Sequence, residues 1–383
     1  MANKRRLVIV SGSFPEIVCG ISPYVRRIAE VTAQLGQYDI HVLTSADPAV
    51  DQDIAKGYQV HPRIKKWGYV QAKNICREIL ALAPDAVNIQ NPTIKYNRWN
   101  SAVMSVVGPL LKRMAPQLRL VVMQHDIAVG KPIFRQRYRP LFRAADAVIV
   151  SNSRDYSAVR AQGIRENKIY RAPMSSYFQL PARGSDARIK ARQKMGIPQD
   201  ASCVAYFGFV LPGRNIDILI GALDMLRRAG RDVYGLILGG PHNDAPDYYR
   251  HCQKLAEELG LAEHIIWTGF ASDDQIADGM MAADVFVSLP ERGADMRNTS
   301  IMTAIQGQLP VVTSRNERYY IDEDLGNLGC RCVGPRDVKG VAEAVENLLD
   351  DPPSEKLLAQ RAAALDPQAV WDNHIKTIVR ACQ

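Results

Sequence analysis

Residues 289–313 read Leu-Pro-Glu-Arg-Gly-Ala-Asp-Met-Arg-Asn-Thr-Ser-Ile-Met-Thr-Ala-Ile-Gln-Gly-Gln-Leu-Pro-Val-Val-Thr. The order predicts a strand end, a polar loop, a helix and a second buried strand, so a helix N-terminus lies beside strand ends. Free N–H groups and the positive end of the helix dipole make such a terminus a phosphate site. Asn298, Thr299 and Ser300 are suitable caps that can also donate to an anion. The segment alone is equally compatible with an ordinary capped helix.

The rest of the chain alternates apolar runs with helical patterns. In the first half, the expected strands are Arg6–Val10, Ile40–Thr44, Ala86–Gln90, Leu118–Met123 and Ala147–Val150. After Pro198 a second set follows, at Val204–Phe207, Val233–Leu238, His264–Trp267, Val285–Ser288 and Pro310–Thr313. Strands that alternate with helices form parallel β-α-β units. We therefore predict an α/β protein with two tandem Rossmann-like domains, whose parallel sheets face an interdomain cleft, and ligands beyond the carboxyl ends of the strands.

The length of 383 residues is sufficient for two such domains. The polar stretch Pro181–Asp186 is the expected linker, which gives an N-terminal domain at 1–185 and a C-terminal domain at 186–366. In the tail, 367–383, apolar residues recur at helical spacing around Trp371 and Ile375. We expect this tail to pack back on the first domain.

Composition bounds the class of protein. With 47% hydrophobic and 23% charged residues, the chain has a globular composition. No apolar run approaches the ~20 residues that span a bilayer, and no signal peptide precedes the first strand, so we expect a cytoplasmic protein. The seven cysteines are odd in number and scattered, which favours reduced core thiols. Cys330 and Cys332 lack the spacing of a zinc knuckle, and we assign no metal site.

The net charge of +8 is unevenly distributed. Residues 1–190 contain 29 basic and 13 acidic residues (net +16), whereas residues 191–383 contain 19 and 27 (net −8). The basic half interleaves cations with aromatic residues, and no nucleic-acid-binding signature accompanies them. We predict either a solvated basic face or salt-sensitive peripheral association with anionic lipid at the inner face of the membrane. The residues expected to carry it are Lys65, Lys66, Lys95, Arg98, Lys112, Arg113, Arg135, Arg137 and Arg139, with Trp67 and Trp99 as interfacial anchors.

Four motifs, taken in chain order, indicate a more specific function. The first is the glycine-containing loop Phe14–Val25, and the second is the pair His125-Asp126 after a strand. Gly208–Leu219 is similar to a G-x-x-x-P-x-K-G diphosphate loop, with Arg214 at the Lys position. Residues 283–312 are similar to an E-x7-E segment followed by G-x-P-V-V. Together they resemble the GT-B retaining nucleotide-sugar glycosyltransferases of the group 1, GT4-like branch, over nearly the whole chain.

The chain departs from that family at further positions outside the Lys position of the diphosphate loop. The two motif glutamates fall on Asp295 and Thr303, so the second carboxylate is lost. Phe209 stands where many members carry an arginine that faces the diphosphate, and Gln308 replaces a glycine. A degenerate transferase fold that serves as a binding or scaffold subunit therefore stays open as an alternative.

The resemblance implies a role for each matching residue. Arg214 would hold the leaving diphosphate, with Arg297 as a second cation and the helix start at Asn298 supplying N–H groups. His125 would contact the donor sugar and Asp126 the acceptor. Asp295 would bind sugar hydroxyls and Thr303 the ribose. The remaining predicted nucleotide-sugar contacts are Gly20, Ile21, Asn215, Thr299, Ser300, Gly269 and Phe270.

The function predicted from these residues is transfer of a sugar from a nucleotide-diphosphate donor to a glycan or lipid-linked acceptor, with retention and without a metal or other cofactor. A GT-B nucleotide-sugar epimerase is a second alternative, although its additional carboxylates and histidine find no match here. An NAD-dependent oxidoreductase would need a G-x-G-x-x-G fingerprint, which the turn Ser11–Pro15 lacks.

Overall fold

We describe a computed structural model of the chain. It defines residues 4–15, 20–48, 50, 57–91, 102–127, 135–176, 178, 180–242, 245–316, 323–365 and 367–383. The chain forms two compact units: unit 1 comprises Met1–Met174 and Trp371–Gln383, and unit 2 comprises Ser175–Val370. The first crossing therefore precedes the predicted linker Pro181–Asp186, because Ser175 and Ser176 already hydrogen-bond to side chains of unit 2.

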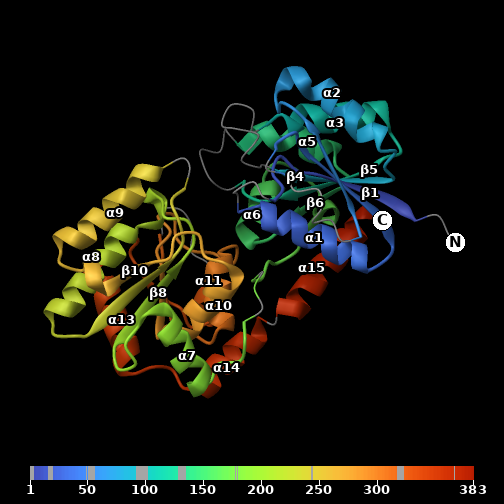
Figure 1. The fold of residues 1–383 in the computed structure, drawn as a ribbon. Coiled ribbons are helices and arrows are strands. Elements are labelled where there is room, and N and C mark those ends of the chain that lie inside the picture. Colours follow the sequence, from blue (N-terminus) through green and yellow to red (C-terminus); the bar gives the residue numbers. More distant parts are fainter. Residues whose placement is uncertain are drawn as a thin grey trace. The chain divides into compact units, whose positions relative to one another are not determined.

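Unit 1 contains a seven-stranded sheet in the order β3-β2-β1-β4-β5-β6-β7, with every described pairing parallel (Figure 1). Its strands are β1 (Arg5–Val10), β2 (Tyr38–Ser45), β3 (Gln59–Ile64), β4 (Ala86–Asn91), β5 (Arg119–Gln124), β6 (Ala147–Val150) and β7 (Ile169–Arg171). Its helices are α1 (Ser22–Gln34), α2 (Ala72–Ala81), α3 (Met104–Met114), α5 (Arg139–Ala144) and α6 (Ser153–Arg160), with 3-10 turns η1 (Tyr69–Gln71), η3 (Gln136–Tyr138) and η4 (Glu166–Lys168).

Unit 2 contains a six-stranded parallel sheet in the order β10-β9-β8-β11-β12-β13. Its strands are β8 (Ser202–Phe207), β9 (Val233–Leu238), β10 (Ile265–Trp267), β11 (Val285–Ser288), β12 (Val311–Ser314) and β13 (Arg331–Val333). Its helices are α7 (Ser185–Met195), α8 (Ile216–Arg228), α9 (Pro246–Glu258), α10 (Asp273–Ala282), α11 (Thr299–Gln306), α12 (Glu323–Asn327), α13 (Val338–Asp350) and α14 (Glu355–Ala364), with 3-10 turns η5 (Pro212–Arg214) and η6 (Ala262–His264). The predicted α/β fold with two parallel sheets is confirmed.

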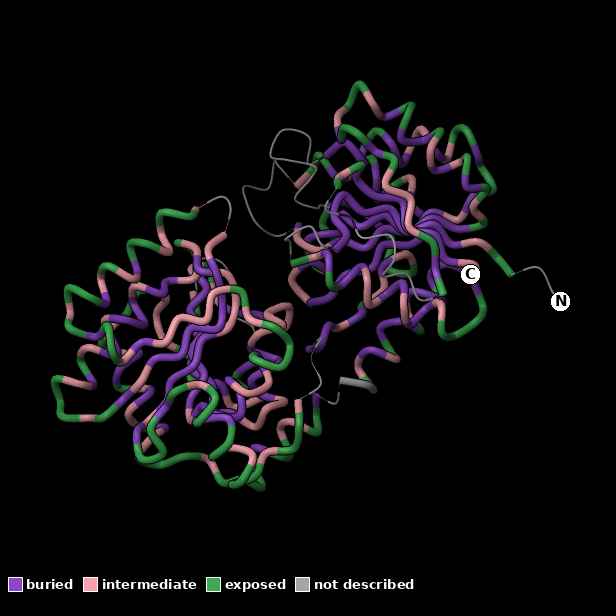
Figure 2. The backbone as a smooth tube through the Cα atoms, in the orientation of Figure 1, coloured by how far each residue is buried: buried purple, intermediate pink, exposed green. Residues whose placement is uncertain are grey.

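The central strands are buried on both faces because helices cover each sheet, as parallel sheets require (Figure 2). All four residues of β6 are fully buried, as are the last four of β1. Burial of such apolar strands contributes roughly 25 cal/mol per Å² of apolar surface. None of the helices in the described residues combines the length and apolar character needed to cross a bilayer.

The returning helix α15 (Pro367–Cys382) joins unit 1 from Trp371 onward. Trp371, Ile375 and Ile378 are buried on one of its faces, as their helical spacing predicts. The Arg119 Nε–H donates to the carbonyl oxygen of Ala381 at 2.9 Å, which fixes the end of the helix to β5.

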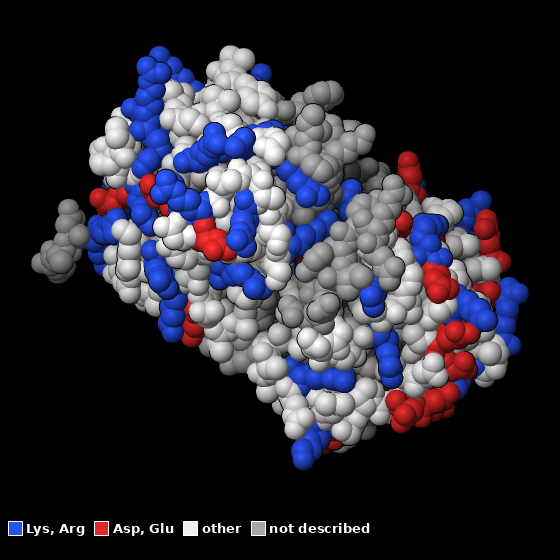
Figure 3. Space-filling model, turned by 180° about the vertical axis from the view of Figure 1, so that it is seen from behind, with Lys and Arg blue, Asp and Glu red and all other residues white. Residues whose placement is uncertain are grey.

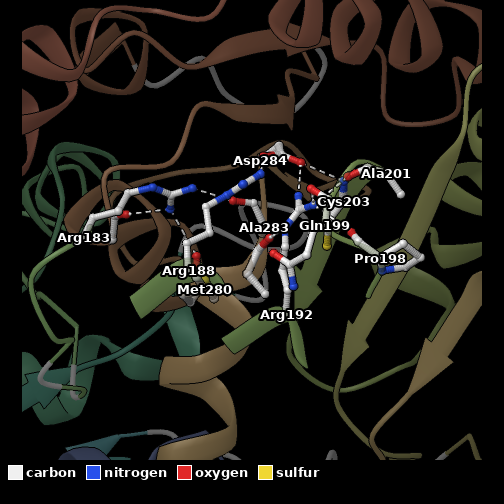
Figure 4. Close-up of polar contacts among 12 residues, drawn as sticks. Arg183, Arg188, Arg192, Pro198, Gln199, Ala201, Cys203, Met280, Ala283 and Asp284 are labelled. Atoms are coloured by element: carbon white, nitrogen blue, oxygen red, sulfur yellow. Dashed lines mark hydrogen bonds and ion pairs between the residues drawn. The ribbon is translucent and has the colours of Figure 1, made fainter. Parts of the chain in front are cut away.

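An arginine cluster ties α7 to the amino ends of β8 and β11 (Figure 4). Arg192 is fully buried, and its guanidinium donates to the Asp284 carboxylate at 2.6 Å and to four backbone carbonyls, among them Ala201 at 2.7 Å. Arg188 binds the other carboxylate oxygen of Asp284. This cluster is a structural joint at the strand ends opposite those where ligands bind α/β sheets.

In each sheet, successive strands of the chain are added toward one edge and then, from one point on, toward the opposite edge. In unit 1 the reversal lies between β1 and β4, and in unit 2 between β8 and β11. Connections on either side of such a point run to opposite faces of the sheet, which leaves an opening at the carboxyl ends of the strands. The topology therefore singles out the loops after β8 and β11 in unit 2, and those after β1 and β4 in unit 1.

Candidate functional site

Two predicted site segments flank the reversal point of unit 2. The loop Gly208–Asn215 follows β8, and the loop Leu289–Asn298 follows β11. The Glu291 N–H donates to the carbonyl oxygen of Gly213 at 3.0 Å, so the two loops are in direct contact. The structure thus brings Arg214, Asn215 and the segment Asp295–Ser300 to one edge of one sheet.

Arg214 ends the 3-10 turn η5 and is half-buried. Within the described residues, no hydrogen bond or ion pair engages its guanidinium, whereas Arg188, Arg192, Arg227, Arg231, Arg297 and Arg336 of the same unit all have acidic partners. Burial raises the pKa of nearby Tyr206 to about 12, and the positive charge of Arg214 opposes that rise. A permanently charged, planar guanidinium whose N–H donors are available is suited to binding a diphosphate.

Asn215 was predicted to contact the nucleotide sugar, but its side chain is fully buried. The amide Nδ2 donates to the carbonyl oxygen of Leu289 at 3.0 Å and to the Glu291 carboxylate at 2.9 Å, and Oδ1 accepts from Arg336 at 3.2 Å. Because its side chain already has partners on both sides, Asn215 acts within the loop framework in this structure.

Asp295 and Arg297 form a close pair in the loop before α11. The Arg297 Nη2–H donates to one carboxylate oxygen of Asp295 at 2.6 Å, while Nε and the backbone N–H reach the other oxygen at 3.0 and 2.8 Å. The carboxylate is 6% exposed and the guanidinium 18%. Binding of sugar hydroxyls by Asp295 would therefore use the few lone pairs that Arg297 leaves open.

The first turn of α11 keeps part of the predicted anion site. Asn298 is the N-cap, but its Oδ1 accepts from the Asp295 N–H at 2.8 Å and caps no helical N–H. The Thr299 N–H donates to the carbonyl oxygen of Arg297. In the described part of the chain the Ser300 N–H has no acceptor, and Ser300 is partly exposed. The helix start therefore presents one open N–H with the helix dipole behind it.

Thr303, at the position of the second motif glutamate, is fully buried. Its hydroxyl donates to the carbonyl oxygen of Thr299 at 2.7 Å and lies 2.8 Å from the hydroxyl of Ser176. The predicted contact between Thr303 and a ribose would require this hydroxyl pair to open.

Aromatic rings gather at the ends of β8, β9 and β10. The ring of Phe209 meets His242 edge to face at 5.2 Å between centroids, and Phe270 at 6.4 Å. Phe270 is 61% exposed, and Gly269 before it has φ 67°, which favours glycine. A Cβ on Gly239 would lie 1.9 Å from the Gly208 carbonyl oxygen, so glycine there permits the close approach of the β8 and β9 ends.

In unit 1, His125 directly follows β5, as the sequence predicts, and is half-buried. Its Nε2 lies 2.8 Å from Oε1 of Gln90 on β4, and its ring meets Tyr24 edge to face at 4.9 Å. Tyr24 stands in the first turn of α1, which begins just after Gly20 and Ile21. The predicted residues Gly20, Ile21 and His125 therefore lie near one another, and a Cβ added to Gly20 would meet no atom of the described residues within 4 Å. Asp126 follows, half-buried.

The sequence analysis did not predict a group of buried amide side chains next to His125. Asn88, Gln90, Asn91 and Gln124 are fully buried amides on β4 and at the carboxyl end of β5. Asn91 donates to Gln124 at 2.8 Å, and Gln90 bonds to both Asn88 and His125. The signal was present in the sequence, since amides interrupt two otherwise apolar runs.

The basic half forms a basic surface on unit 1. On the face shown in Figure 3, Lys and Arg predominate over the unit 1 part, whereas acidic residues gather on unit 2. The prediction that Trp67 is an interfacial anchor is wrong: the residue is 6% exposed, and its indole N–H donates to the Ser45 hydroxyl at 2.8 Å. Lys112 is held by Asp146 at 3.0 Å. Lys65, Lys66, Arg113 and Arg137 are exposed, and Arg135 and Arg139 are half-buried. Lys95, Arg98 and Trp99 lie outside the described residues.

Comparison with known proteins identifies the C-terminal half. Residues 187–364 match the family model described as "Glycosyl transferases group 1". This part of the chain belongs to the group 1 glycosyl transferases. It contains Arg214, Asn215 and Asp295–Thr303, so the donor-side residues of the prediction fall inside the family domain.

A GDP-mannose-dependent alpha-(1-6)-phosphatidylinositol monomannoside mannosyltransferase of Mycolicibacterium smegmatis is 29% identical over 281 residues, 69% of this chain and 68% of that protein. A D-inositol 3-phosphate glycosyltransferase of Streptomyces coelicolor is 27% identical over 209 residues, 51% of this chain and 43% of that protein, so the match spans less than half of that relative's length. The structure of Anabaena HepE in complex with UDP and glucose superposes with a TM-score of 0.75 at 17% identity, covering 98% of this chain and all of that one. This likeness establishes the glycosyltransferase fold. It covers both units of the chain.

No group of three or more His, Cys, Asp or Glu side chains in the described residues is arranged to hold a metal ion. Of the cysteines described, five are buried and Cys332 is exposed, all as free thiols. Burial raises the pKa of the Cys203 thiol to about 12, so this thiol stays protonated and unreactive at neutral pH.

Proposed function

We propose that this group 1 glycosyl transferase moves a sugar from a nucleotide-diphosphate donor to a glycan or lipid-linked acceptor, with retention of anomeric configuration and without a metal. The family match supports glycosyl transfer. The Mycolicibacterium relative is named as GDP-mannose-dependent, and HepE was solved with UDP and glucose, which supports a nucleotide-activated donor.

The observation that carries the proposal is the guanidinium of Arg214 at the reversal point of unit 2, which has no hydrogen-bond or ion-pair partner among the residues that the structure describes. A diphosphate leaving group gains negative charge in the transition state, so a cation fixed beforehand stabilises the transition state more than the substrate. Removing one such fixed donor commonly raises the barrier by ~3–4 kcal/mol. The open Ser300 N–H and the α11 dipole supply a second, backbone donor at the same edge. These fixed donors can take the role that a divalent cation has in other transferases.

In unit 1, we assign contact with the donor sugar to His125. The Gln90 amide nitrogen donates to Asn88, so its Oε1 faces His125 Nε2 and accepts a hydrogen bond from the Nε2–H. This bond fixes the ring orientation. Retention itself is proposed from the family resemblance, and Asp126 is the proposed acceptor contact.

The basic surface of unit 1 supports an anionic, lipid-linked acceptor and peripheral association with the inner face of the membrane. The Mycolicibacterium relative is named for a phosphatidylinositol mannoside. In place of Trp67, the exposed pair Tyr69 (46%) and Val70 (93%) stands beside Lys65 and Lys66 as the apolar contact. Each cation near an anionic surface contributes ~1 kcal/mol, so a cluster is required.

A thermal-shift panel of UDP-, GDP-, ADP- and dTDP-sugars tests the donor proposal. A donor at ~100 times its dissociation constant adds ~2.7 kcal/mol of stability. We expect one nucleotide series to stabilise the wild type and Arg214→Ala to lose turnover by two orders of magnitude or more while staying folded. Turnover should persist in EDTA. Retained turnover in a folded Arg214→Ala variant would remove Arg214 from the site.

A scaffold function is the second candidate, because the Thr303 hydroxyl is already paired with Ser176 where the family has a carboxylate. It predicts nucleotide binding without turnover. Release of free sugar or nucleoside diphosphate from a stabilising donor would exclude it.

A further inference from the structure

Asn215 holds the loop that carries Arg214 to the neighbouring acidic loop. Both N–H bonds of its amide are used, one on the Leu289 carbonyl and one on the Glu291 carboxylate. Its Oδ1 accepts from Arg336, whose second Nη reaches Asp217 at 3.3 Å. This arrangement also settles the orientation of the amide, since only the nitrogen end can donate to a carbonyl and a carboxylate.

The backbone at Asn215 is in the left-handed region, with φ 53° and ψ 48°. Asn and Gly adopt this conformation more readily than other residues. The family pattern has glycine at this position, so the conformation alone does not require a side chain. The asparagine amide is therefore an addition in this chain, and its function must be sought in its contacts.

The contact with Glu291 matters because of where Glu291 lies. Its backbone N–H donates to the carbonyl oxygen of Gly213, the residue before Arg214, so Glu291 is an acidic residue in direct contact with the Arg214 loop. Yet the Glu291 carboxylate accepts a hydrogen bond from the Asn215 amide, and the Arg214 guanidinium has no acidic partner among the described residues. An arginine and a carboxylate on adjoining loops would otherwise be expected to pair, at a gain of charge-assisted hydrogen bonds.

We propose that Asn215 is a positioning residue that holds the Glu291 carboxylate away from Arg214 and so keeps the guanidinium available for the diphosphate. Arg336 fixes the amide in the orientation that this requires. The inference rests on the proposed function, and it assigns to Asn215 a role distinct from contact with the ligand. It also explains how an acidic residue is tolerated in a loop that receives an anion.

The test is calorimetric titration of the full-length chain with UDP, GDP, ADP and dTDP, using the one that binds the wild type most tightly. Asn215→Gly keeps the backbone conformation but releases Glu291. We expect the dissociation constant to rise at least about tenfold, because a hydrogen bond to a charged group contributes ~1.5–3 kcal/mol and ~1.4 kcal/mol is tenfold. The double variant Asn215→Gly/Glu291→Gln should recover to within about threefold of the wild type. The matched control is the double variant Asn215→Gly/Glu346→Gln, in which the second substitution alters an ion pair with Arg231 instead of Glu291. Its affinity should not recover.

A merely structural role for Asn215 predicts a different pattern. In that case the affinity would stay low in the Asn215→Gly/Glu291→Gln double variant, and that result would overturn the inference. In the Arg214→Ala background, Asn215→Gly should weaken binding no further, since the group that Glu291 captures is gone. Wild-type affinity in Asn215→Gly alone would also refute the proposal while leaving the proposed function intact. Failure of the wild type to bind any of the four nucleotides would contradict both.

Discussion

Asp284→Asn should destabilise unit 2 strongly while leaving its ligand edge unchanged. The Asp284 carboxylate accepts from Arg192 at 2.6 Å and from the Cys203 N–H at 2.8 Å, and it also pairs with Arg188. Asparagine keeps the shape but removes the charge and turns one acceptor into a donor that faces a guanidinium. The fully buried Arg192 would then keep its carbonyl acceptors but lose its counter-charge.

Breaking a buried ion pair by removing one partner costs ~3–5 kcal/mol. We take the lower end, about 3 kcal/mol, because the Asp284 side chain is 23% exposed and the Arg192 carbonyl contacts remain. For a unit of the size of Ser175–Val370, each 1 kcal/mol shifts the midpoint temperature by roughly 2–4 °C, so we expect a fall of about 6–12 °C.

Differential scanning calorimetry of the full chain measures this shift in the unit 2 transition. The matched control is Asp278→Asn, which removes the Lys194–Asp278 pair between α7 and α10. The Lys194 side chain of that pair is 63% exposed, so its loss should cost less than about 1 kcal/mol. If Asp284→Asn lowers the midpoint no more than Asp278→Asn does, the cluster in Figure 4 is not the joint that we describe.

Three further predictions concern unit 1. His125→Ala should impair sugar transfer more than nucleotide binding; loss of nucleotide affinity in calorimetric titration would place His125 elsewhere. Burial lowers the pKa of His374 to about 4, so the unfolded chain binds a proton between pH ~6.5 and 4 that the native chain does not. Stability should thus be complete above pH ~6.5 and fall toward pH 4, and His374→Gln should flatten that urea-denaturation profile; an unchanged slope would contradict the assignment. Replacing Tyr69 and Val70 by serine should reduce flotation with anionic vesicles at low salt, and equal wild-type recovery with neutral vesicles would refute membrane association.

The fold could be predicted where strands contain a continuous apolar run. β1, β5 and β6 contain such runs, and the sequence places these strands within a residue or two of their observed bounds. The strands β3, β7 and β13 escaped prediction because they are short or polar and lie at sheet edges. β3 reads Gln-Val-His-Pro-Arg-Ile, and its proline is tolerated because an edge strand need not donate on both sides. Their conformation comes from pairing with a neighbour.

The candidate site divides in the same way. The position of Arg214 and Asp295 at one edge follows from strand order, because both loops leave carboxyl ends of adjacent parallel strands. The partners of Asn215 did not follow, since Leu289, Glu291 and Arg336 are 74, 76 and 121 residues away along the chain. The prediction for Trp67 was wrong for the same reason. Its neighbours Lys65 and Lys66 indicated a surface residue, whereas its hydrogen-bond partner Ser45 lies at the end of β2, 22 residues earlier in the chain.

Thr303 bears on how a family position can change its role. Its hydroxyl joins α11 to Ser176, and Gln306 on the same helix donates to the Ser175 hydroxyl at 2.7 Å and to the Leu365 carbonyl at 2.9 Å. Ser175 begins unit 2, and Leu365 lies shortly before the chain leaves it. The helix whose first turn forms the proposed anion site is thus fixed by the segments through which the chain enters and leaves the unit. A glutamate at 303 would place a carboxylate in this buried contact, against the Thr299 carbonyl, where only a hydroxyl is available to balance it. At residue 303 this chain therefore has a hydroxyl that supports the helix where the family pattern has a carboxylate.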